Sequence, residues 1–128
     1  MRQARKQRDA SSYINRMVER IVQKFDPEQI ILFGSQARGN AHPGSDVDLL
    51  VVMPVKGSVF EKGLDICESL HGIPFPVDIV VTTPEEFAWR KGFVGTIEWP
   101  ATTEGKVLYV RTRPGHDASS RVDRQGRK

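Results

Sequence analysis

Two short stretches decide the fold of this chain, LFGSQARG at residues 32–39 and SDVDLLVV at residues 45–52. The first ends an apolar run that breaks off at Gly34, and the second is an apolar run that opens with two carboxylates one residue apart. Residues i and i+2 of a β-strand point to the same face of the sheet. We therefore expect Asp46 and Asp48 to project together, while the residues that alternate with them enter the core.

Paired carboxylates of this kind predict a metal site. Two neighbouring anions repel each other and are costly to remove from water. A bound cation removes both costs, and hard oxygen ligands are those that Mg²⁺ and Mn²⁺ prefer. The histidines (His42, His71 and His116) have no ligand spacing between them, so the sequence does not indicate a zinc site.

A phosphate-binding turn is expected shortly before the carboxylate pair. Gly34 permits a tight turn with unusual dihedral angles, and residues 35–38 are expected to begin a short helix. Free backbone N–H groups at a helix start bind phosphate well. Neither a Walker loop nor a Gly-x-Gly-x-x-Gly fingerprint is present. Arg38, about one turn farther on, is placed either to neutralise phosphate or to form a salt bridge with one of the aspartates.

The spacing of these motifs resembles a known family. Gly34-Ser35, ten intervening residues and then Asp46-x-Asp48 are similar to the hallmark of the DNA polymerase β-type nucleotidyltransferase superfamily. The strings GSQARG and SDVDL resemble its minimal (MNT) branch, which includes the antitoxins of HEPN/MNT toxin–antitoxin pairs. The resemblance implies metal-dependent transfer of a nucleoside monophosphate, such as AMP from ATP, to a hydroxyl acceptor.

The resemblance also implies roles for individual residues. Asp78 interrupts the apolar stretch 77–81 and matches the position of the family's third carboxylate, on the strand beside the paired aspartates. The alternative, an aspartate at a solvent-facing strand end, stays open. The expected site combines three catalytic, metal-binding carboxylates with a nucleotide-binding turn: Asp46, Asp48, Asp78, Gly34, Ser35 and Arg38.

The hydrophobic pattern predicts a single α/β domain. The clearest helix spans residues 11–25, with apolar residues at i, i+3, i+4 and i+7, and Asp26-Pro27 stops it. In a later helix, Phe60, Leu64 and Cys67 share one face, so Cys67 is expected in the core. Short strands separated by helices are typical of this class, and the family resemblance adds that the four-stranded sheet is mixed and flanked by helices. Strands are expected at 29–33, 45–53, 77–81 and 106–110, and further helices at 59–70, 85–91 and 95–104.

Length and charge suggest one domain between two basic ends. A chain of 128 residues that is 38% hydrophobic and 27% charged is typical of one globular domain. Residues 1–10 hold four basic and one acidic residue, and residues 111–128 hold six basic and two acidic ones. Because the whole chain has 19 basic and 16 acidic residues, the part between is acidic. We expect a nucleotidyltransferase domain over 11–111, a flexible N-terminus over 1–10 and a disordered tail over 112–128.

Other features of the sequence limit the setting of the protein. No apolar stretch approaches the roughly 20 residues that span a bilayer, and the N-terminus lacks the apolar segment of a signal peptide. The single cysteine, Cys67, cannot form an internal disulfide, which favours a reducing cytoplasm. The basic ends could attract nucleic acid, but residues 121–128 contain no aromatic residue that could stack on a base.

Three functions follow from these observations. The favoured one is an active nucleotidyltransferase that attaches AMP to a tyrosine of a HEPN toxin and so acts as an antitoxin, because this chain has no room for the acceptor-binding domains of larger relatives. The second is a binding module that neutralises its partner by contact alone, and the third is a nucleotidyltransferase for a small molecule or RNA. Retention of Gly34-Ser35 with three acidic residues favours catalysis, since unpaired acids are a cost to a mere scaffold.

Overall fold

The computed structural model describes residues 10–39, 45–92 and 104–112. The predicted helix over residues 95–104, apart from its last residue, lies outside these ranges, and so does His42. Both predicted terminal segments also lie outside them, except for residues 10 and 112. Within the described ranges, no helix combines the length and apolar character that crossing a membrane requires.

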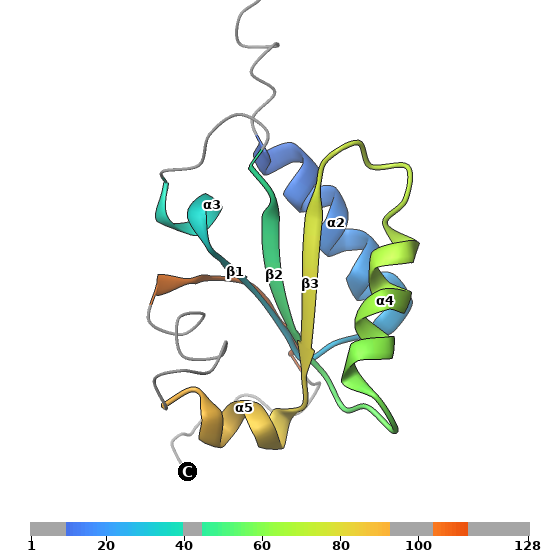
Figure 1. The fold of residues 1–128 in the computed structure, drawn as a ribbon, viewed down its shortest axis with the longest axis vertical. Coiled ribbons are helices and arrows are strands. Elements are labelled where there is room, and N and C mark those ends of the chain that lie inside the picture. Colours follow the sequence, from blue (N-terminus) through green and yellow to red (C-terminus); the bar gives the residue numbers. More distant parts are fainter. Residues whose placement is uncertain (1–9, 40–44, 93–103, 113–128) are drawn as a thin grey trace, which may run out of the picture.

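The centre of the domain is a four-stranded mixed sheet, as the sequence predicted (Figure 1). The strands lie in the order β3-β2-β1-β4. β1 runs antiparallel to both β2 and β4, whereas β2 and β3 are parallel. The strands are β1 (Gln29–Phe33), β2 (Val47–Val52), β3 (Val77–Thr82) and β4 (Lys106–Val110).

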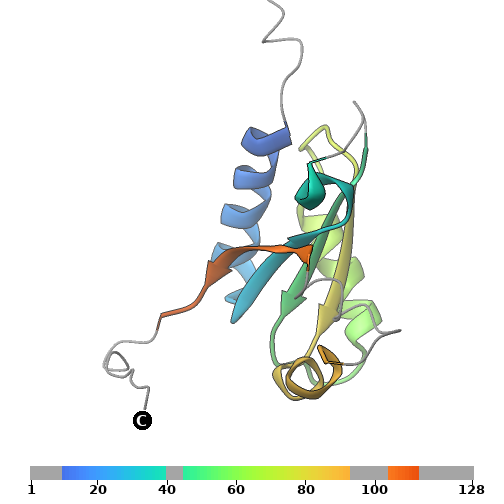
Figure 2. The same cartoon turned by 90° about the vertical axis from the view of Figure 1, so that its left-hand side faces the viewer.

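Helices lie on both faces of the sheet. The long helix α2 and helix α4 pack on one face, while the short helix α5 lies against the other face, at the end of β3 farthest from α3 (Figure 1). Figure 2 shows the same arrangement from the side, with α2 in a layer directly beside the strands. The helices are α2 (Ala10–Phe25), α3 (Ser35–Arg38), α4 (Val59–Ser69) and α5 (Pro84–Arg90).

The central strand β2 is buried on both faces because its apolar residues alternate between two clusters. Leu49 and its neighbours on one side pack with Met17 and Ile21 of α2. Leu50 and Val52 pack on the other side with residues of β1 and α5. A strand covered on both faces is expected to be continuously apolar. The break in this run is an aspartate at position 48, which therefore needs an explanation beyond folding.

The prediction that Cys67 fills the core is wrong, because Cys67 is exposed. α4 carries two apolar stripes, and the one that faces the sheet contains Gly63 and the fully buried Ile66. Gly63 faces β3, since a Cβ at this position would lie in ordinary contact, 3.4 Å from the carbonyl oxygen of Ile79. The helix packs through this stripe and leaves the stripe of Cys67 on the surface.

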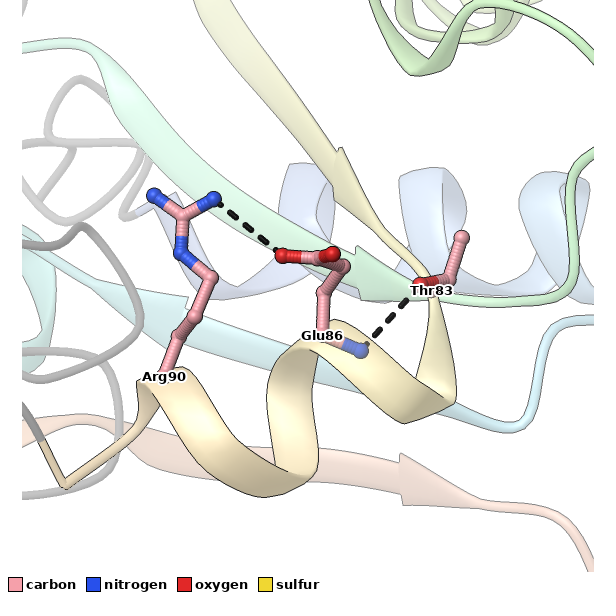
Figure 3. Close-up of polar contacts among 3 residues, drawn as sticks. All are labelled: Thr83, Glu86 and Arg90. Atoms are coloured by element: carbon pink, nitrogen blue, oxygen red, sulfur yellow. Dashed lines mark hydrogen bonds and ion pairs between the residues drawn. The ribbon is translucent and has the colours of Figure 1, made fainter.

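Helix α5 begins with the cap that the sequence predicted (Figure 3). The Glu86 N–H donates to Thr83 Oγ1 at 3.2 Å, and Pro84 occupies the first turn. Arg90 Nη1 pairs with Glu86 Oε1 at 3.4 Å, one turn apart on the helix (Figure 3). The cap satisfies a backbone donor that the helix itself cannot, so it is the stronger of the two contacts.

Replacing Thr83 by Ala is expected to lower the free energy of unfolding by about 1 kcal/mol, because the N–H of Glu86 loses its acceptor. Equilibrium unfolding in urea measures this loss. Thr83→Ser keeps the hydroxyl and is the matched control, with an unfolding midpoint near that of the unaltered protein. Equal losses in both variants would assign the effect to the methyl group instead of the cap.

Candidate active site

The candidate site lies where the end of β1 meets the beginnings of β2 and β3. Asp48 of β2 is paired in register with Phe33 on one side and with Asp78 on the other. Neighbouring strands lie about 4.8 Å apart, so the two carboxyl groups project side by side from the sheet. Helix α5 covers the opposite end of this face and leaves the carboxylates open (Figure 1).

Three acidic side chains interact electrostatically at this position. Asp46 and Asp78 are exposed, whereas Asp48 is half-buried between them. Burial raises the pKa of the Asp48 carboxyl group, and the negative charges of Asp78 and then Asp46 raise this pKa further. The structure therefore brings two of the predicted carboxylates, Asp46 and Asp78, within electrostatic reach of the third, Asp48, which is repelled by both.

The predicted glycine turn lies directly against this group. Gly34 follows the strand residue that pairs with Asp48, and its backbone has φ 77° and ψ −160°, a region that is essentially restricted to glycine. A Cβ at this position would overlap Asp48 Oδ2 and lie 3.1 Å from Asp48 Cγ. Helix α3 starts immediately afterwards at Ser35, and the N–H groups of Ala37 and Arg38 both donate to the Gly34 carbonyl oxygen at 3.1 Å. The N–H groups of Ser35 and Gln36 precede them and have no acceptor within the helix. A phosphate group at this turn would lie next to the carboxylates.

Two side-chain contacts join helix α3 to other segments of the chain. Gln36 Nε2 donates to the carbonyl oxygen of Ser45 at 3.1 Å, which ties α3 to the segment that carries Asp46. Arg38 Nη1 pairs with Glu104 Oε1 at 3.5 Å, and both side chains are about half exposed. The sequence did not predict either contact, because no pattern in it pairs Gln36 with Ser45 or Arg38 with Glu104. The salt-bridge partner expected for Arg38 was an aspartate of the site, whereas the observed partner is Glu104.

Arg38 also acts on the carboxylates. Its positive charge lowers the pKa of Asp48, against the larger opposing effects of burial and of the other two aspartates. An exposed ion pair such as Arg38–Glu104 contributes little stability. Arg38 can therefore exchange Glu104 for a phosphate group without a large loss in stability.

The residues at this site suit a divalent cation chemically. Three carboxylates supply hard oxygen ligands, and the raised pKa of Asp48 reflects negative charge that a cation would offset. In the part of the chain that the structure describes, no three His, Cys, Asp or Glu side chains converge closely enough to hold a metal ion. The aspartates thus form an open acidic face, and their role as metal ligands remains a prediction.

Comparison with known proteins gives the chain its family. Residues 14–99, more than half of the sequence, match the family described as "Nucleotidyltransferase domain". The chain belongs to this nucleotidyltransferase family. The nucleotidyltransferase is also 34% identical over 82 residues to a Methanocaldococcus jannaschii protein named "Putative protein adenylyltransferase MJ0604", an alignment that covers 64% of this chain and 78% of that protein.

Solved structures share the fold of this nucleotidyltransferase. A Sulfolobus solfataricus protein, described as a "putative nucleotidyltransferase", superposes with a TM-score of 0.57 at 22% identity, over 78% of this chain and 79% of its own. A toxin–antitoxin structure with AMP-PNP superposes with a TM-score of 0.53 at 20% identity, over 76% of this chain and 73% of its own. These likenesses confirm the predicted fold class.

Proposed function

We propose that this nucleotidyltransferase transfers AMP from ATP to a hydroxyl group of a partner protein, in a reaction that depends on Mg²⁺ or Mn²⁺. The observation that supports the proposal is the close approach of Gly34 to Asp48, the carboxylate that feels the negative charges of Asp78 and Asp46. The name of the Methanocaldococcus jannaschii relative, a protein adenylyltransferase, supports a protein as the acceptor.

The partner in this proposal is a HEPN toxin, its acceptor a tyrosine, and the chain its antitoxin, acting in the cytoplasm. The resemblance of GSQARG and SDVDL to the minimal nucleotidyltransferases supports this assignment. The fold shared with one toxin–antitoxin structure is consistent with it.

The proposed transfer is an in-line displacement at the α-phosphorus of ATP. The acceptor oxygen forms a bond to this phosphorus, the bond to the oxygen that bridges to the β-phosphate breaks, and pyrophosphate leaves. Asp46, Asp48 and Asp78 would hold the divalent ions, which neutralise the triphosphate when they are bound. Asp78 lies on the outer strand, where an acceptor can reach it, and it takes the hydroxyl proton.

The turn and Arg38 have binding roles in this mechanism. The N–H groups that follow Gly34, together with the Ser35 hydroxyl, hold the β- and γ-phosphates. Once Arg38 has separated from Glu104, its guanidinium group neutralises the charge that accumulates on the leaving pyrophosphate. Because the phosphates are fixed at the turn, the α-phosphorus is directed toward Asp48 and Asp78, which is the positioning that phosphoryl chemistry requires.

The experiment that tests this function uses ATP labelled at the α-phosphate, Mg²⁺ and the protein encoded by the adjacent reading frame. We expect label on that protein, at a tyrosine that peptide mapping identifies, and no label when EDTA is present. Growth arrest by the partner alone, relieved when the nucleotidyltransferase is expressed with it, would support the antitoxin role. Relief of arrest without any label would favour neutralisation by contact, and label on RNA or a small molecule would overturn the protein acceptor.

A further inference from the structure

One apolar surface of the molecule has no role in the fold. α4 exposes Phe60 (72%), Leu64 (54%) and Val59 (38%), and Cys67 lies on the same side. These side chains form one wall of a groove of about 390 Å³, and residues 78–81 of β3 form the other wall. Most of the lining is apolar, so contact with water is unfavourable here and burial by another molecule would be favourable. We call this surface the α4–β3 groove.

The α4–β3 groove runs directly into the candidate active site. Asp78, the carboxylate that receives the acceptor proton in the proposed mechanism, lines the groove at one end. Val80 also lines it and packs with the apolar cluster on the sheet face that carries Asp48. A molecule that lies in the groove therefore contacts a carboxylate that is paired in register with Asp48 of the candidate site.

The charges around the groove favour a basic partner over a second copy of this chain. Asp78 lines the groove with a negative charge, and Glu61, next to Phe60 in the first turn of α4, is exposed. The one lysine of α4, Lys62, lies over the ring of Phe25, 5.8 Å from the ring centre. Asp65 and Glu68 of α4 instead line a separate pocket that also contains Arg20 and Lys24 of α2. Two copies joined here would bring acidic side chains against acidic side chains, which disfavours association.

The chain's own terminal segments do not match the groove. Residues 1–9 and 113–128 are basic, but neither segment has an aromatic residue. The large apolar residues in them are only Met1 and Val122. An occupant of the groove needs large apolar side chains flanked by positive charge, and these segments supply only the charge.

We propose that the α4–β3 groove is the docking site for the acceptor protein, which inserts large apolar side chains flanked by basic residues and so presents its hydroxyl group to Asp78. The inference rests on the proposed transfer of AMP to a protein. It adds that binding of the acceptor is separate from binding of the nucleotide. The α4 surface sets which protein is modified, while the Gly34 turn and the carboxylates carry out the transfer.

A short synthetic peptide tests this proposal directly. It has a central tyrosine, a leucine–phenylalanine pair on each side and two lysines at each end, and in a matched peptide serines replace the apolar pairs. Fluorescence anisotropy measures binding. We expect the apolar peptide to bind at least about tenfold more tightly than the serine peptide, because buried aromatic and aliphatic anchors carry most of the affinity of such interfaces.

Three variants separate the groove from the rest of the surface. Leu64→Asp and Phe60→Asp should weaken binding of the apolar peptide at least about tenfold. Both side chains are more than half exposed, so both variants should fold, and an acidic residue in the first turn of α4 suits the helix dipole. The control is Val107→Asp, at 56% exposure on the opposite edge of the sheet, which should leave binding unchanged.

Cys67 provides an independent readout. It is the chain's one cysteine and lines the groove, so N-ethylmaleimide labels this position alone. The apolar peptide should slow the alkylation of Cys67 in proportion to the fraction of grooves that it occupies. The serine peptide should leave the rate of alkylation unchanged. Absence of protection, or equal binding by the Leu64→Asp variant and the unaltered protein, would overturn the proposal. So would a dimer in sedimentation that Leu64→Asp dissociates, because the occupant would then be a second copy.

The test also distinguishes failure of the docking proposal from failure of the proposed function. Asp48→Asn should bind the apolar peptide as tightly as the unaltered protein does, because Asp48 is not among the groove residues. Peptide binding that depends on the groove, in a protein that transfers no AMP to any acceptor, would refute the proposed function and leave the docking site in place. If Phe60→Asp and Leu64→Asp left the transfer of AMP to the partner unchanged, the docking site would be refuted and the proposed function would stand.

Discussion

Replacing Asp48 by Asn is expected to lower the rate of AMP transfer at least about 100-fold, the loss that follows removal of one preorganised electrostatic contact in an active site. Asp48 lies between the Gly34 turn and Asp78, so of the three carboxylates it is the one that would hold a divalent ion nearest the turn. Transfer of labelled AMP under saturating ATP and Mg²⁺ measures the effect. Glu19→Gln on α2 is the control, because Glu19 is exposed and α2 packs on the face of the sheet opposite Asp48, so this variant should transfer AMP normally.

The same variant should make the metal-free protein more stable at about pH 7. Burial and two neighbouring aspartates raise the pKa of Asp48, so the folded state binds this proton more tightly than the unfolded state does. Stability therefore falls as the pH rises from the ordinary pKa of an aspartate through the raised pKa, and the full penalty is present above the raised pKa. Asn carries no charge and escapes this penalty. The melting temperature of the variant should be higher than that of the unaltered protein near pH 7, and the two melting temperatures should be equal at acid pH.

Added Mg²⁺ should reverse this order, since a cation stabilises the form in which Asp48 is ionised. The melting temperature of the unaltered protein should rise with Mg²⁺ and that of Asp48→Asn should rise less. Normal transfer by Asp48→Asn, or melting temperatures that do not respond to Mg²⁺ in either protein, would exclude a metal site built on this residue.

The local parts of the fold could be predicted from the sequence because their signals are short-range. Thr83 and Ser58 accept hydrogen bonds from the N–H groups three residues on, as their capping boxes indicated. The strand over residues 29–33 has the bounds that its apolar run predicted. The second strand starts at Val47, two residues later than predicted, so Asp46 lies just before it.

Contacts between distant segments could not be predicted in the same way. The approach of Gly34 to Asp48 follows from the antiparallel register of β1 and β2, and a pattern along one strand does not contain that register. The ion pair of Arg38 with Glu104 joins segments 66 residues apart. The orientation of α4 was predicted wrongly because hydrophobic periodicity gave weight to Leu64 and Cys67, whereas the helix packs on the sheet through the stripe of Gly63 and Ile66.

Replacing Gly34 by Ala should have the second large effect, a loss of AMP transfer of at least about 100-fold together with a loss of stability. The backbone at Gly34 lies in a region that costs other residues about 1–3 kcal/mol. The new Cβ would also overlap Asp48 Oδ2, so the carboxylate or the turn must shift. A displacement of about 1 Å is enough to cost about 100-fold in a reaction that depends on positioning. Urea unfolding and labelled-AMP transfer measure the two losses.

The Gly72→Ala variant separates the effect of backbone strain from the effect of the overlap with Asp48. Gly72 also has a positive φ of 97°, but a Cβ there would meet nothing within 4 Å, and the residue lies after α4, away from the site. This variant should lose a similar amount of backbone stability and keep its rate of transfer, because strain alone does not move Asp48. If Gly34→Ala transferred AMP as fast as Gly72→Ala, the contact between the turn and Asp48 would have no catalytic role. The phosphates would then have to be held by another part of the protein, and the mechanism proposed for the turn would fail.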